Sequence, residues 1–300
     1  MQKEKLSGWI SLIIVYVVWG STYLAIRIAM QPGAGFEPFT LVTMRLLVSA
    51  GVLFLLAGVT RQKMKIPRGE RLAVLLPGIF QWLAGNGFVT WAEKTVNSGY
   101  AALMVATTII WVTIFESLIE KRRLSAKTFL ILSIGFAGLV FLNVPALRSD
   151  EGVDGFGVLI LLFASISWGI GTLIQKYRRT TLTPTVSSAY QQLIGGIAVL
   201  GMRFILNEPL PAPTPAAWGA WLYLVVFGGI LAYTAFIIAV RNLPTRIVMT
   251  YSYVNPLVAL FLGWMVLKEE ITSWTIIGAG LILLSVFGIY KTKTAAKTQA

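Results

Sequence analysis

The sequence contains neither cysteine nor histidine among its 300 residues. The absence of cysteine excludes disulfide bonds and thiolate metal sites, and it leaves the redox compartment undetermined. The absence of histidine removes the commonest metal ligand and the side chain that titrates most readily between pH 5 and 8. A phosphate-binding Gly-Lys-Ser/Thr motif is also missing. We therefore expect no metal, no cofactor and no catalytic residues.

Charged residues are scarce, at 12% of the chain, whereas a soluble domain carries about 25%. Hydrophobic residues make up 56%. The net charge is +13, but lysine and arginine lie in short clusters between long apolar runs and not along amphipathic faces. This pattern excludes a soluble domain and argues against a nucleic-acid partner. The expected surroundings are a lipid bilayer.

Apolar runs of membrane-crossing length occur ten times in the sequence. About 20 helical residues span the hydrocarbon core of a bilayer. Backbone groups in lipid must pair within their own segment, and the alternation of a barrel strand is absent. We expect an all-α membrane protein with ten transmembrane helices. The expected spans are 6–30, 39–60, 72–92, 95–115, 128–147, 155–175, 182–202, 218–240, 247–267 and 271–290.

The distribution of lysine and arginine predicts the orientation of these spans. Nineteen fall on the side of the two termini, and four fall on the other side: Lys94, Arg148, Arg203 and Lys268. Because positive charge accumulates on the cytoplasmic side, both termini are expected inside the cell, with the chain in the inner membrane. The loops are short, so the function is expected within the membrane. The oligomeric state stays open, and a monomer is compatible with the pattern.

The second half of the chain echoes the first at an offset near 147 residues, as Phe80 and Phe227 illustrate. We expect residues 1–147 to form a first five-helix repeat, 148–154 an outer linker, 155–291 a second repeat and 292–300 a cytoplasmic tail. Since five is odd, the second repeat starts on the opposite side of the membrane. Inverted repeats with a midplane site between them are typical of secondary transporters.

Several short motifs resemble the EamA-type drug/metabolite transporters along nearly the whole chain. The motifs are Trp19-Gly20-Ser21-Thr22-Tyr23, Pro38-Phe39 with Arg45, Ser98-Gly99-Tyr100-Ala101-Ala102-Leu103, Asn255-Pro256-Leu257, and Gly278. Within that family the aromatic-rich interior is most similar to the YddG-type exporters of aromatic amino acids. One departure is Ile109, which stands where the ninth span has Pro256 and argues against a matching kink in the fourth.

The resemblance implies two inverted halves, alternating access and outward movement of a small metabolite, most of all aromatic and other neutral amino acids. Other cargoes remain open, such as a cationic drug, a nucleobase or a sugar derivative. A membrane-embedded enzyme is a remote alternative, because it would need a nucleophile or a metal cluster within the membrane.

The candidate substrate-binding residues are aromatic or uncharged polar side chains at mid-span. Trp19 and Tyr23 share one helix face, and Trp168 is the repeat-related counterpart of Trp19. These side chains predict an aromatic-walled passage, with ordinary packing as the alternative. Hydrogen-bonding groups at membrane depth should face protein or a wet cavity, so they could bind cargo or join helices. The complete set is Trp19, Tyr23, Trp82, Asn86, Thr107, Trp111, Trp168, Thr172, Tyr233, Tyr253 and Asn255.

Two further residues of the spans have alternative interpretations. Pro256 removes a backbone donor and is a hinge candidate, or else a static kink. Arg45 is the one charge well inside a span, which indicates either a functional group or a residue that pairs with a neighbouring helix or snorkels to the membrane surface. Glu93 is interpreted as a boundary residue. No acidic residue occupies the centre of a span, so we expect a facilitator or an exchanger.

Overall fold

The computed structural model describes residues 2–96, 98–144, 154–262, 264–265 and 271–296. Within this part of the chain every regular element is helical. Arg148, Lys268, residues 148–153 of the predicted linker and the end of the predicted tail lie outside the described residues.

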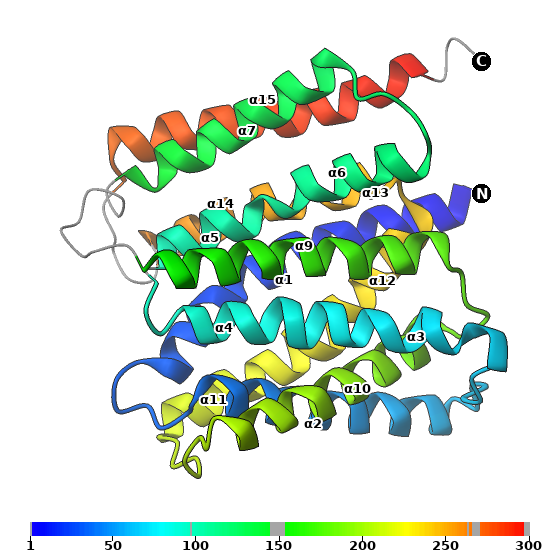
Figure 1. The fold of residues 1–300 in the computed structure, drawn as a ribbon, viewed down its shortest axis with the longest axis vertical. Coiled ribbons are helices and arrows are strands. Elements are labelled where there is room, and N and C mark those ends of the chain that lie inside the picture. The colour runs from blue at the N-terminus through cyan, green and yellow to red at the C-terminus, as the bar shows by residue number, and fades with distance from the viewer. Residues whose placement is uncertain (1, 97, 145–153, 263, 266–270, 297–300) are drawn as a thin grey trace.

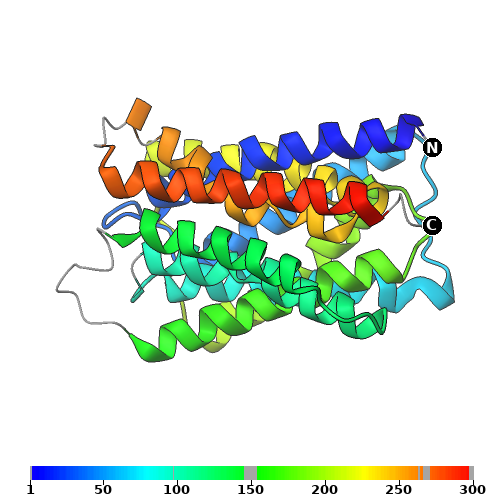
Figure 2. The same cartoon turned by 90° about the horizontal axis from the view of Figure 1, so that it is seen from above.

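The helices follow the order of the apolar runs. The first half contains α1 (Gln2–Met30), α2 (Pro38–Val59), η1 (Arg68–Glu70), α3 (Arg71–Pro77), η2 (Gly78–Gly87), α4 (Phe88–Ala92), α5 (Ser98–Ala106), α6 (Thr108–Ile119) and α7 (Ala126–Leu142). The second half contains α9 (Gly155–Tyr177), α10 (Pro184–Ile205), α11 (Pro215–Tyr223), η3 (Leu224–Ala232), α12 (Tyr233–Asn242), α13 (Thr245–Val248), α14 (Tyr251–Leu262) and α15 (Ser273–Ala296). The helices run roughly along one axis, and both chain ends lie at the same end of the bundle (Figures 1 and 2).

The outer faces of the helices are apolar. Among the described residues, six helical segments are long and apolar enough to cross a membrane: Gln2–Met30, Pro38–Val59, Arg68–Ala92, Gly155–Tyr177, Pro215–Asn242 and Ser273–Lys291. Leu103–Ile119 and Ala126–Leu142 are shorter apolar helices. Large hydrophobic side chains are exposed along these segments, including Ile13, Leu55, Phe129, Leu159, Ile276 and Leu284. Exposed apolar surface of this extent indicates contact with a membrane or with another apolar surface.

Helix starts follow local sequence signals. Pro184 and Pro215 occupy the first helical turn, where the missing N–H is not needed. The side chains of Thr183 and Thr214 cap these two helices by accepting from backbone N–H groups. The first turn of α2 is capped by a residue far away in the sequence. The Glu208 carboxylate accepts from the backbone N–H groups of Phe39 and Thr40 at 2.9 and 2.7 Å.

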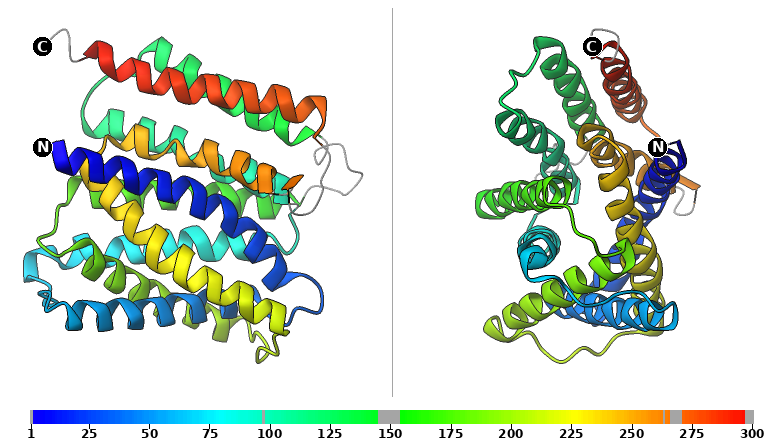
Figure 3. Two further views of the ribbon diagram at one scale, coloured as in Figure 1. Left: turned by 180° about the vertical axis from the view of Figure 1, so that it is seen from behind. Right: turned by 90° about the vertical axis from the view of Figure 1, so that its right-hand side faces the viewer.

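Helix pairing in the first half is repeated in the second. The third helical stretch, 68–92, packs on α9 and α10, and the stretch 215–242 packs on α1 and α2. Likewise α1 contacts α14, and α9 contacts α6. The last helices of the halves, α7 and α15, pair with each other at one edge of the bundle (Figures 1 and 3). Each pairing therefore has a counterpart with the halves exchanged.

Two long segments of the described chain wind as π-helix, a conformation that is rare and frequently marks functional sites. They are η2 and η3. Adding the sequence offset of 147 to 78–87 gives 225–234, which overlaps η3. Both halves therefore widen the same helix at nearly the same place.

The fourth and ninth helical stretches are interrupted. The break between α5 and α6 falls at Thr107, although no proline is nearby and Ile109 argued against a kink. The hydroxyls of Thr107 and Thr108 donate to carbonyls three residues earlier, which competes with helical pairing. The break before α14 falls at Met249 and Thr250, whereas Pro256 lies buried inside α14. The hinge role of Pro256 stays a prediction.

Candidate functional site: a cavity between the two halves

A cavity of about 110 Å³ lies inside the bundle. It is somewhat smaller than an engineered cavity of ~150 Å³ that admits benzene in another protein, so its volume is of the order of one aromatic ring. The first half supplies walls from α1, α2, η2, α4, α5 and α6, and the second half from α9 and α14. The lining residues used below are Trp19, Thr22, Tyr23, Arg45, Trp82, Gly85, Asn86, Thr90, Glu93, Val105, Thr108, Ser165, Trp168, Tyr251 and Asn255.

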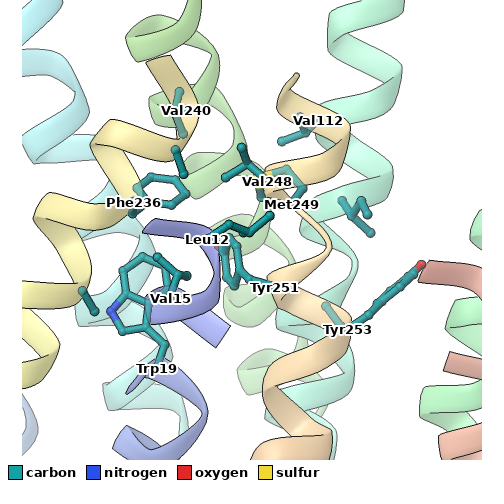
Figure 4. Close-up of a cluster of buried hydrophobic side chains, with 14 of the residues drawn as sticks. Leu12, Val15, Trp19, Val112, Phe236, Val240, Val248, Met249, Tyr251 and Tyr253 are labelled. Carbon is teal, nitrogen blue, oxygen red and sulfur yellow. The ribbon is translucent and has the colours of Figure 1, made fainter. Parts of the chain in front are cut away.

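Aromatic rings form one boundary of the cavity. The ring of Trp19 lies 5.5 Å from that of Trp168, 5.1 Å from that of Tyr251 and 5.2 Å from that of Phe236, measured between centroids. The tilted and edge-on geometries are those that aromatic pairs prefer. Toward the N-terminus from Trp19, α1 continues with the buried residues Val15 and Leu12, which lie beside the rings of Tyr251 and Phe236 (Figure 4). We call this group of four rings the aromatic seal.

The other walls are polar. Trp82, Asn86 and Thr90 follow one another at four-residue spacing along η2 and α4, and all three line the cavity together with Glu93. Arg45 of α2 is 5% exposed, and its guanidinium lies 5.3 Å from the ring of Trp82. The cavity therefore combines aromatic faces with one cation and one carboxyl group.

Gly20 and Gly85 allow the helices around the cavity to approach closely. A Cβ on Gly20 would lie 2.5 Å from the Cβ of Val258, so α1 and α14 meet at nearly backbone distance. A Cβ on Gly85 would lie 2.9 Å from the ring of Trp168. Gly85 thus leaves room for the Trp168 ring of the second half, and Gly20 allows the close approach of α1 to α14.

Six of the predicted site residues line the cavity: Trp19, Tyr23, Trp82, Asn86, Trp168 and Asn255. The structure brings them together from α1, η2, α9 and α14. Whether they contact cargo stays a prediction.

The remaining predicted site residues do not line the cavity. Several of them instead form hydrogen bonds between helices, which was the alternative to binding cargo. Thr172 and Tyr233 belong to a buried polar cluster, in which the Tyr233 hydroxyl lies 2.7 Å from Oε1 of Gln81 and of Gln191. The Gln81 amide donates to Thr172 at 3.1 Å. These bonds join η2, α9, α10 and α12.

Two more predicted residues bind other parts of the protein. The Tyr253 hydroxyl points away from the aromatic seal (Figure 4) and donates to the Leu132 carbonyl at 2.9 Å. The Trp111 indole donates to the Thr107 hydroxyl at 3.2 Å. Neither side chain lines the cavity, and Thr108 lines it in place of its neighbour Thr107.

Sequence reasoning missed Glu93 as a cavity residue and left Arg45 open. Glu93 directly follows the last residue of α4, as expected of a residue at the end of a span, but it also lines the cavity. Its position three residues after Thr90 and seven after Asn86 was the available signal, since such residues share a helix face.

Comparison with known proteins agrees with this architecture. The profile of the EamA-like transporter family matches the chain twice, at residues 6–144 and 155–291. The chain belongs to the EamA-like transporter family. It is therefore a multi-pass membrane protein of a family of transporters, and its specificity is a separate question.

Individual relatives are named as transporters or by family. An Escherichia coli (strain K12) protein named uncharacterized inner membrane transporter YedA is 32% identical over 289 residues, covering 92% of this chain and 88% of that protein. The Bacillus subtilis (strain 168) uncharacterized transporter YoaV is 26% identical, covering 93% and 94%. The Arabidopsis thaliana WAT1-related protein At3g02690, chloroplastic, is 22% identical, covering 93% and 68%. A solved crystal structure with 19% identity superposes with a TM-score of 0.77 over all of both chains, which shows the shared fold.

Proposed function

We propose that this protein is a secondary transporter that exports small metabolites, above all aromatic and other neutral amino acids, by alternating access. The observation that carries the proposal is the cavity at mid-bundle, which is walled by both halves and closed toward the chain termini by the aromatic seal. Rearrangement of the aromatic seal would connect the cavity to the end of the bundle that holds the chain termini.

The repeat architecture supports alternating access. We propose ten membrane-spanning helices in two inverted repeats, 1–147 and 155–291, joined by the linker 148–154. The two family matches, the exchange-symmetric helix pairings and the paired π-helical segments support this division. Two similar halves of opposite orientation can exchange conformations, which moves access from one side to the other.

The orientation is proposed from charge. The loops at the end of the bundle that holds both termini carry most of the lysines and arginines, so we place that end in the cytoplasm and the chain in the inner membrane. The name of the Escherichia coli relative supports this location. The cavity then faces away from the cytoplasm in the described conformation.

The cargo is proposed from the cavity chemistry. Aromatic walls suit a planar or apolar side chain, and the polar groups of Arg45, Asn86 and Glu93 suit the charged ends of a zwitterion. Glu93 is the one carboxyl group among the lining residues, and it lies near the end of its helix, away from mid-span. We keep the proposal of a facilitator or exchanger driven by the gradient of the cargo.

Counterflow in proteoliposomes tests the proposal. Vesicles with purified protein are preloaded with one unlabelled amino acid at a time, and entry of labelled phenylalanine, tryptophan, threonine or methionine is followed. The proposal expects stimulated entry with aromatic cargo that needs no pH gradient. Entry that depends on a pH gradient would contradict the facilitator, and absence of entry with every amino acid would move the search to nucleobases, sugars and cationic drugs.

A further inference from the structure

Arg45 is a buried charge without a charged partner in the described part of the chain. It is 5% exposed, and its Nε makes no hydrogen bond. No carboxylate of the described residues forms an ion pair with it. Its guanidinium lies 5.3 Å from the centre of the Trp82 ring. A buried cation left in this state is unfavourable unless something else compensates it.

The position of Arg45 argues against a snorkelling side chain. Arg45 lies seven residues after Pro38, the first residue of α2, which corresponds to a depth of about 10 Å at 1.5 Å per residue. Its side chain lines the cavity and is buried, whereas Arg27 of α1 is exposed. The guanidinium therefore faces the space that cargo would occupy.

A complementary acceptor lies at a similar depth. Asn86 precedes Glu93 by seven residues, and Glu93 follows the last residue of α4. The adjacent ends of α2 and α4 are tied by the ion pair of Lys94 with Glu37 at 2.5 Å. Asn86 therefore lies about 10 Å from the same end of the bundle as Arg45, and its buried Oδ1 has no hydrogen-bond partner.

We propose that Arg45 is the anion-binding group of the cavity and that the cargo it holds carries a carboxylate beside an apolar or aromatic body. A guanidinium presents two parallel N–H donors that match a carboxylate. Trp82 and Trp168 provide the faces for the apolar body, and Asn86 Oδ1 accepts from an ammonium group where the cargo has one. This inference rests on the proposed function and narrows the cargo to carboxylates.

The test measures binding separately from transport. Thermal unfolding of the purified protein in detergent is followed with and without each of two matched pairs: phenylalanine against phenylalaninamide, and 3-phenylpropionate against 3-phenylpropionamide. A ligand that binds only the folded state raises Tm, and the increase grows with the ratio of the ligand concentration to its Kd. We expect both acids to raise Tm and both amides to bind at least about tenfold more weakly.

Variants assign the effect to the residue. In Arg45→Gln the increment in Tm caused by the acids should disappear, and Arg45→Lys should recover part of it. Arg27→Gln removes the exposed arginine of α1 and should keep the full increment. If Arg45→Gln does not fold, Arg45→Lys carries the assignment to the residue, and the comparison of acids with amides on the unmodified protein still tests whether binding requires a carboxylate.

The outcomes separate this inference from the amino-acid proposal. Equal binding of acids and amides, or no binding of any acid, overturns the role of Arg45, whereas amino-acid counterflow would stand by itself. Selective binding of acids without counterflow of any amino acid supports Arg45 and overturns amino acids as the cargo.

Discussion

Gly20 follows Trp19 and Gly169 follows its repeat-related counterpart Trp168, yet the structure predicts different consequences for an alanine at each glycine. A Cβ on Gly20 would lie 2.5 Å from the Cβ of Val258, about 1 Å inside the ~3.5 Å contact distance of carbon atoms. The Cβ of Val258 is fixed to the backbone, so it cannot rotate away. Accommodating Gly20→Ala would require α1 and α14 to separate by roughly 1 Å.

At Gly169 the nearest atom to an added Cβ is the Cγ2 methyl of Val112 at 3.0 Å, and the next lies at 3.9 Å. A shift of a few tenths of an ångström relieves this contact. Overpacking typically costs ~1–3 kcal/mol. The gain in helix propensity from glycine to alanine is the same at both positions and cancels in the comparison. Gly20→Ala should therefore be less stable than Gly169→Ala by about 1–3 kcal/mol.

Thermal unfolding of the two purified variants in detergent measures this difference. We expect a lower Tm for Gly20→Ala by at least about 2 °C. Combining Gly20→Ala with Val258→Gly removes the obstructing Cβ and should recover stability beyond the sum of the single effects. Equal stability of the two alanine variants, or the reverse order, would refute the reasoning from close helix approach.

Two further predictions concern the cavity and the loop at its end. Trp168→Ala should reduce phenylalanine counterflow at least about tenfold, because it removes a cavity wall, while Trp111→Ala should retain most of it, since Trp111 lies outside the cavity; equal losses would contradict the cavity assignment. The Asp154 carboxylate accepts from Thr95 Oγ1 at 2.7 Å and from the Phe156 N–H at 3.1 Å, which lowers the pKa of that carboxyl. Its stabilising contribution is present above the ordinary carboxyl pKa of about 3.9 and is lost as the pH falls through the lowered value. Thr95→Val should lower Tm at pH 7, and this difference should shrink below about pH 4; a pH-independent difference would contradict the hydrogen bond as the cause.

The positions of the helices could be predicted because apolar runs and proline signals are local. The expected span 155–175 matches α9, which ends at Tyr177, and Pro184 begins α10 as a proline at a helix start should. The contact between Trp19 and Trp168 was predictable from the repeat, since related positions of two halves meet near a shared axis.

The faces of interrupted helices could not be predicted by the same reasoning. No local signal in the sequence marks the π-helical turns of η2, although Trp82 and Asn86 within η2 were among the predicted residues that line the cavity. A one-residue error also moves a side chain by about 100° around a helix, which separates Thr107 from the lining residue Thr108. The role of Arg45 could not be predicted from the sequence, because whether a carboxylate from another helix reaches its guanidinium depends on how the helices pack.

The central claim is that the cavity opens alternately to the two ends of the bundle. Because the chain has no cysteine, a single introduced cysteine is the only thiol. Val105 lines the cavity, whereas Val15 is buried outside the cavity lining, one helical turn from Trp19 toward the N-terminus. In oriented vesicles, a membrane-impermeant maleimide should label Val105→Cys from the outer face and Val15→Cys from the cytoplasmic face, with cargo changing the two rates in opposite directions. Labelling rates at both sites that do not change with any cargo, or labelling of both sites from one face alone, would contradict alternating opening of the cavity.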